Sequence, residues 1–175
     1  MSLNLTLKYY TMKIKLFKTL FIMSLLFIYN CKAQTTNDYI TFYNNVVPKL
    51  NTIVPNKTQF YGQNFSNFYN ELLNKQLNVV NFSCDTKIDP SSKYYVLRLF
   101  FEDSDLWSVA TDNPFQYPWI SITFENEIPN QIKNMILQNH GEWDNTFVQF
   151  FSNMKIEKIK FIGINGYNST DWSEK

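Results

Sequence analysis

The stretch Asn139–Asp144, NHGEWD, holds the chain's only histidine beside two carboxylates. Such a grouping suits a general base or a metal ligand, so His140, Glu142 and Asp144 are the first catalytic candidates. A zinc site needs about three converging protein ligands, however, and the sequence contains neither an HExxH nor a CxxC motif. The same residues also fit a turn between two helices, with His140 at one C-terminus and the acids opening the next helix. We therefore expect no metal and no other cofactor.

Cys84 is the one thiol that could pair with His140 as a nucleophile. Activated cysteines lie at helix N-termini or beside cations, where the thiol pKa falls. Cys84 instead ends an expected strand and precedes Asp85, whose charge disfavours a thiolate. A small buried core residue is the simpler interpretation. A hydrolase that uses His140 with Glu142, Asp144 and Cys84 is kept as the alternative function.

A proline-stiffened aromatic stretch is the best binding candidate. The segment 106–119, LWSVATDNPFQYPW, carries four large aromatic residues around two prolines: Trp107, Phe115, Tyr117 and Trp119. Such a segment could form a rigid surface for a protein, peptide or glycan, or it could cover an open sheet. The acidic stretch just before it, Glu102–Trp107, lacks the glycine and the spacing of a calcium loop. We expect that stretch to form a solvated turn.

The N-terminal segment has the charge pattern of a secretory leader. Lys13, Lys15 and Lys18 precede an uncharged apolar run, Thr19–Tyr29. A membrane-spanning helix needs ~20 apolar residues, and this run has the shorter length of a signal-peptide hydrophobic region. We expect translation to start at Met12, because that residue alone opens a conventional leader.

The end of the leader admits two cleavage sites. Residues Ile28–Cys31, IYNC, resemble the lipobox of bacterial lipoproteins, although Asn30 stands where that family usually carries Gly, Ala or Ser. The resemblance implies lipidation of Cys31 and a membrane anchor. Alternatively, CKA before Gln34 resembles the small-x-small site of the ordinary signal peptidase, and cleavage after Ala33 gives a soluble secreted protein. Neither route leaves Cys84 a disulfide partner, so we expect a fold without disulfides.

The charge of the chain is unevenly distributed. The formal net charge is +1, but four lysines and no acid precede Cys31, so the rest carries 12 basic and 15 acidic residues, net −3. Arg98 is the only arginine. This composition excludes a typical nucleic-acid-binding protein, which needs a basic surface. Arg98 lies in an expected strand, where we predict an ion pair with a carboxylate.

The pattern of apolar residues predicts a mixed fold. Two N-terminal segments, 39–54 and 65–77, repeat apolar residues at helical spacing, and Pro48 predicts a kink or break in the first. Two later segments, 129–141 and 143–154, predict a helix pair. Strands are expected at 79–84, 93–102, 119–124 and 156–164, with a further short strand around 107–110.

These observations predict a signal peptide over residues 1–30, a flexible tether over 31–38, and one α+β domain over 39–175. A mostly antiparallel sheet of about four strands should pack against the N-terminal helices and the C-terminal helix pair. We expect a small protein of the bacterial periplasm or outer membrane, anchored by lipid. Its expected role is non-enzymatic binding of an envelope protein or cell-wall glycan, including inhibitor or immunity-type roles.

Overall fold

The computed structural model of the 175-residue chain describes residues 15, 17, 18, 34–88, 90–139 and 142–175. Contacts divide the chain into two units, Met1–Ala33 and Gln34–Lys175. In the first unit the described residues are helical, and Cys31 lies outside the described ranges. No helix of the described residues is long and apolar enough to cross a membrane.

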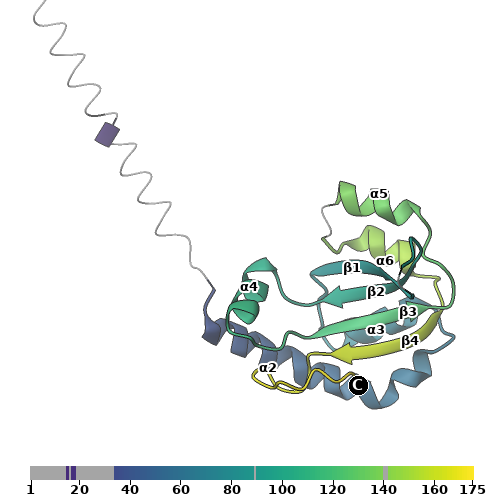
Figure 1. The fold of residues 1–175 in the computed structure, drawn as a ribbon, viewed down its shortest axis with the longest axis horizontal. Helices are drawn as coiled ribbons and strands as arrows, with labels where there is room; N and C mark the ends of the chain where they lie inside the picture. Colours follow the sequence, from purple (N-terminus) through teal and green to yellow (C-terminus); the bar gives the residue numbers. More distant parts are fainter. Residues whose placement is uncertain (1–14, 16, 19–33, 89, 140–141) are drawn as a thin grey trace, which may run out of the picture. The chain divides into compact units, whose positions relative to one another are not determined.

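The second unit has an α+β fold, in which helices pack against one four-stranded antiparallel sheet (Figure 1). Its elements in chain order are α2 (Thr36–Ile53), the 3-10 helix η1 (Val54–Phe60), α3 (Phe65–Asn74), β1 (Asn81–Thr86), β2 (Tyr94–Phe100), α4 (Ser104–Asp112), β3 (Trp119–Phe124), α5 (Gln131–Gln138), α6 (Asn145–Phe151) and β4 (Ile156–Ile162). The strands lie in the order β1-β2-β3-β4, so each pairs with its neighbour in sequence. The predicted fold class is confirmed.

One face of the sheet forms the floor of the core. Apolar residues alternate along each strand, and the register aligns them across strands: Leu99 pairs with Ile120, and Ile120 pairs with Phe161. All three side chains are fully buried. The alternation that predicted strands at 93–102 and 119–124 therefore also predicted the buried face.

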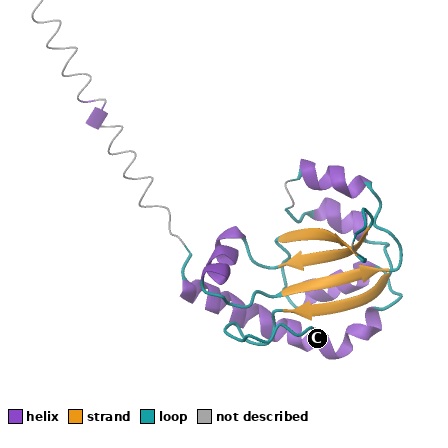
Figure 2. Cartoon of the chain, viewed as in Figure 1, coloured by secondary structure: helices purple, strands orange, loops and turns teal. Residues whose placement is uncertain are grey.

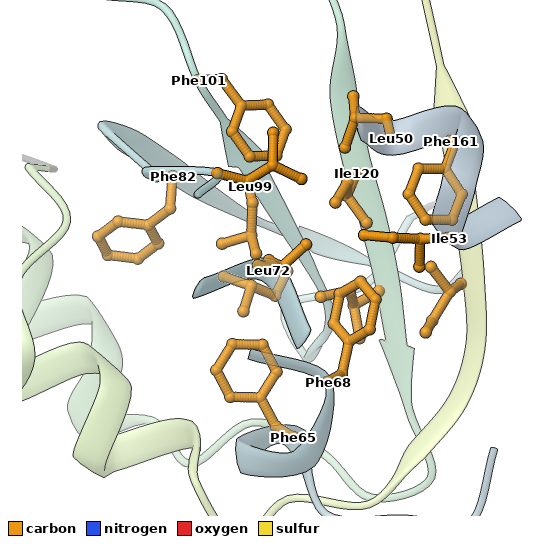
Figure 3. Close-up of a cluster of buried hydrophobic side chains, with 14 of the residues drawn as sticks. Leu50, Ile53, Phe65, Phe68, Leu72, Phe82, Leu99, Phe101, Ile120 and Phe161 are labelled. Atoms are coloured by element: carbon orange, nitrogen blue, oxygen red, sulfur yellow. The ribbon is translucent and has the colours of Figure 1, made fainter. Parts of the chain in front are cut away.

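Helices α2 and α3 cover this face (Figure 3). The close-up shows Leu50 and Ile53 of α2, with Phe65, Phe68 and Leu72 of α3, turned toward the strand residues. Phe147 and Phe151 of α6 complete the layer beside Phe82 of β1, with ring centroids 4.3 and 6.4 Å from Phe82. Burial of these large apolar side chains is the main source of stability.

Within the described residues of the second unit, no helix covers the opposite face of the sheet, which Figure 2 shows turned toward the viewer. Its side chains are half-buried for the most part, and they form rows across the strands. The first row is Asn81, Phe100, Trp119 and Ile162, and the second is Ser83, Arg98, Ser121 and Lys160. Arg98 pairs with Asp85 on this face, so the predicted ion pair is confirmed.

Three local predictions differ from the structure, wholly or in part. The first helix begins at Thr36, within the expected tether, because Thr35 and Asp38 form a capping box with bonds of 2.8 and 3.3 Å. Of the kink or break predicted at Pro48, the break does not occur: the helix continues through this residue, which lies on its solvent side, where water can satisfy the carbonyl that lacks a donor. The strand expected around 107–110 is part of α4, which Asp103 caps.

Candidate functional site

Aromatic residues gather at one end of the open face. Phe100 and Trp119 are register partners on β2 and β3, with ring centroids 6.4 Å apart. Tyr117 stacks on Trp119 at 5.3 Å. Trp172, from the C-terminal segment, lies 5.4 Å from Tyr117 and 5.9 Å from Trp119. These four residues are called the aromatic cluster below.

The cluster is partly open to solvent. Trp172 is 41% exposed, and the other three side chains are half-buried. Two of its members, Tyr117 and Trp119, belong to the aromatic stretch that was predicted to bind. Trp172 was missed, because it lies in a polar tail whose sequence gives no sign of where the tail docks.

Buried Gln116 holds that tail in place. Its side-chain nitrogen donates hydrogen bonds to the carbonyls of Ser169, at 3.1 Å, and Asp171. Its side-chain oxygen accepts from the backbone N–H of Asn165 at 3.1 Å. Its backbone N–H donates to Tyr167 at 2.7 Å. A single side chain next to Tyr117 therefore positions the segment that carries Trp172.

The end of the tail also pairs with the edge strand β4. Phe161 and Lys175 exchange two backbone hydrogen bonds of 2.9 Å. Glu174 forms ion pairs with Lys160 at 2.5 Å and with Lys158 at 3.7 Å. These contacts cover part of an edge that would otherwise offer unpaired backbone groups.

The remaining two predicted binding residues lie apart from the cluster. Phe115 packs between Tyr39, at 5.7 Å, and Tyr167, at 5.3 Å, as part of the link between α2 and the tail. Trp107 is 47% exposed on α4. The structure therefore separates the four predicted residues into a pair in the aromatic cluster, one packing residue and one exposed tryptophan.

Trp107 borders a hollow of about 210 Å³ where β2 leads into α4. The residues that line this hollow are Asn81, Phe100, Glu102, Asp103, Ser104 and Trp107. Phe100 thus contributes both to the hollow and to the aromatic cluster.

Glu102 is the unexpected residue in this hollow. It is 2% exposed, although the sequence predicted a solvated turn, so that prediction was wrong. One carboxylate oxygen, Oε2, accepts from the backbone N–H of Phe101 at 3.2 Å, while Oε1 is buried with no hydrogen-bond partner among the described residues. Burial raises the pKa of Glu102 to about 7, and the nearby charge of Asp103 adds to this.

The adjacent carboxylate of Asp103 has structural partners instead. Its Oδ1 accepts from the backbone N–H groups of Asp105 and Leu106, at 3.1 and 2.9 Å, and so caps α4. Its Oδ2 accepts from Gln34 at 3.1 Å. Asp103 is therefore held by the fold, whereas Glu102 has unused hydrogen-bonding capacity.

The described catalytic candidates do not line the hollow, although the backbone of Glu142 forms an isolated β-bridge with Asn81, which does. His140 falls outside the described residues. Asp144 caps α6 through the backbone N–H groups of Thr146 and Phe147, and Glu142 is exposed. Cys84 packs against the core, and burial raises its thiol pKa to about 12, so the thiol stays protonated. No hydrogen bond joins the side chains of Cys84, Glu142 and Asp144.

The part of the chain that the structure describes holds no group of three or more His, Cys, Asp or Glu residues arranged for a metal ion. Compared with known proteins, the chain matches no protein-family model, no curated protein and no solved structure. The function must therefore be argued from the sites themselves.

Proposed function

We propose that this protein is a non-enzymatic glycan-binding protein of the bacterial cell envelope and that the aromatic cluster is its binding surface. The observation that carries the proposal is the contact of Trp172 with Tyr117 and Trp119 on the open face of the sheet. The cluster remains partly exposed although the chain builds a large core from the same residue types.

The chemistry of the cluster suits a sugar ring. A pyranose presents a face of C–H groups, and the electron-rich face of an aromatic ring attracts such groups. Sugar hydroxyls point outward from the ring edge and need hydrogen-bonding partners. Asn81, Ser121 and Lys160 lie in the same or the next row of the open face and supply such partners.

A glycan fits this surface better than a large protein partner does. A stable protein interface covers about 800 Å² on each side and has an apolar centre with few charges. Here the row next to the one that holds Phe100 and Trp119 contains two charged residues, Arg98 and Lys160. A short aromatic platform bordered by polar groups is sufficient for a few sugar units.

Export and a lipid anchor at Cys31 form the second part of the proposal. The support is the sequence pattern alone: lysines, a short apolar run and a lipobox-like IYNC. An anchor at Cys31 would keep the domain close to the wall polymers that it is proposed to bind.

The decisive experiment is cosedimentation of the full chain, extracted from membranes in detergent, with insoluble cell-wall glycan. We expect Trp119→Ala and Trp172→Ala each to weaken binding at least about fivefold, because the stacking of a nucleic-acid base on an aromatic side chain contributes about 1–3 kcal/mol and a sugar ring stacks in a similar way. Trp107→Ala is the matched control, because Trp107 is an exposed tryptophan outside the cluster. Equal binding by all four chains would refute the glycan proposal.

A further inference from the structure

The hollow beside α4 has the size of a site for a small molecule. Its volume of about 210 Å³ is below the ~300–1,000 Å³ of pockets that hold drug-sized ligands. Phe100 and Trp107 supply aromatic walls, and Asn81 and Ser104 supply polar groups. A ligand here would place only a few atoms in the hollow.

Glu102 gives the hollow its chemical character. A buried carboxylate is costly unless a cation or several donors compensate its charge. No lysine or arginine lines the hollow, and no ion pair to Glu102 occurs among the described residues. Oε1 accepts no hydrogen bond from any residue that the structure describes. A positive group that carries N–H bonds would supply both the compensating charge and the donor.

The other walls favour the same kind of ligand. Trp107 is 47% exposed on α4, and aromatic faces attract cations that approach them. The carboxylate of Asp103 adds negative charge, and its capping bonds offset the positive end of α4. An anion would meet two carboxyl groups here, and a neutral ligand would bring no charge that stabilises the ionised form of Glu102.

We propose that this hollow binds a small organic cation with N–H donors, a primary ammonium or a guanidinium, whose charged group meets Glu102 and whose hydrocarbon part packs on Trp107. The hollow shares Phe100 and Asn81 with the proposed glycan surface, but its ligand meets Glu102 and Trp107, so neither proposal depends on the other. A bound cation would donate a hydrogen bond to Oε1 of Glu102, which has no donor among the described residues, and it would stabilise the ionised carboxylate.

The test uses the ¹⁵N-labelled full chain and four probes of similar size: butylammonium, butylguanidinium, butyltrimethylammonium and butanol. Shifts of the backbone amides of Asn81 and Ser104 report binding. We expect saturable shifts with the first two probes below about 50 mM, and at least tenfold weaker binding of the last two, which lack charge or N–H donors. The ammonium and guanidinium arms show which cation is preferred.

Variants assign the binding to the hollow. Glu102→Gln keeps the size of the side chain and removes its charge, so it should weaken butylammonium binding at least tenfold. Asp105→Asn removes an exposed carboxylate that does not line the hollow and should leave binding unchanged. Trp107→Ala truncates a side chain that is 47% exposed and should weaken binding, whereas Trp172→Ala should not.

The proposal fails on three outcomes. Equal affinity for butylammonium and butyltrimethylammonium would show that N–H donors do not matter. Unchanged affinity in both Glu102→Gln and Trp107→Ala would place the cation elsewhere. Absence of shifts with either N–H cation up to about 50 mM would show that the hollow does not take this class of ligand.

Discussion

The side chain of Gln116 donates a hydrogen bond to the backbone carbonyl of Asp171, 55 residues further along the chain. The same side chain contacts Ser169 and Asn165, so all three of its bonds go to the C-terminal segment. Gln116 is fully buried, and its neighbour in sequence is Tyr117 of the aromatic cluster. The aromatic cluster therefore forms only when the tail is docked, because Trp172 directly follows Asp171, which Gln116 holds in place.

We expect Gln116→Leu to release the tail. The change removes three side-chain hydrogen bonds and leaves their partners without a replacement, which should cost about 2–3 kcal/mol of unfolding free energy. Amide exchange of Lys175, whose N–H donates to Phe161, should accelerate when the tail leaves β4. Urea unfolding and hydrogen exchange measure the two effects.

Gln149→Leu provides the control for this change. Gln149 lies exposed on α6, so the same substitution there should alter the unfolding free energy by less than about 0.5 kcal/mol. Amide exchange of Lys175 in Gln116→Leu at the wild-type rate would show that other contacts hold the tail.

Glu102 should make the fold less stable as the pH rises. Its pKa increases from an ordinary 4.5 to about 7 on folding, so the folded state binds the proton more tightly. The resulting stability is complete below pH 4.5 and is lost as the pH rises through 7. The loss between pH 5 and pH 8 should be about 2–3 kcal/mol. Urea unfolding at the two pH values measures it.

Glu102→Gln should remove this loss. The variant chain keeps every other titratable group, including His140, so the difference between the two chains isolates Glu102. We expect the wild-type chain to lose more stability than the variant over that range, and the variant to be the more stable one at pH 8. If the unfolding free energies of the two chains changed in parallel with pH, ionisation of Glu102 would not be the cause of the loss of stability.

The sheet was predictable from the sequence because its signals are local. Alternation over Trp119–Phe124 identified a strand and its buried side, and the helical spacing of 39–54 identified α2. In both cases neighbouring residues carry the whole pattern. The start of α4 also had a local signal, since Asp103 is a good N-cap with Asp105 in the first turn. The apolar residues after it had favoured a strand instead.

The hollow was not predictable, because distant residues bury Glu102. Gln34 contacts Asp103 from 69 positions away. Burial raises the pKa of Tyr39, and Glu102 lies close enough for its charge to add to that rise. Taken alone, the acidic stretch matches a solvated turn. Trp172 was missed for the same reason, since its partners Tyr117 and Trp119 lie more than 50 residues earlier.

The anchor can be tested with a palmitate analogue in a bacterial host. We expect the wild-type chain to incorporate the label and Cys31→Ser to lose it completely, because acylation needs the Cys31 thiol. Cys84→Ser is the matched control and should keep the label, since Cys84 packs against the core. An unlabelled wild-type chain whose N-terminus is Gln34 would support the alternative cleavage after Ala33.

A comparison of alanine substitutions at Gly62 and Gly163 separates the energetic cost of backbone strain from the cost of steric overlap. Gly62 and Gly163 have φ angles of +72° and +71°, so a Cβ atom is strained equally at both. A Cβ at Gly62 would lie 3.9 Å from Glu125, in ordinary contact, but one at Gly163 would lie 1.9 Å from the backbone oxygen of Tyr117. Gly62→Ala should cost about 1 kcal/mol of unfolding free energy. Gly163→Ala should cost about 2 kcal/mol more, because it displaces the backbone beside the aromatic cluster. Urea unfolding of the two variants measures the difference, and equal losses would contradict this close packing of Gly163 on Tyr117.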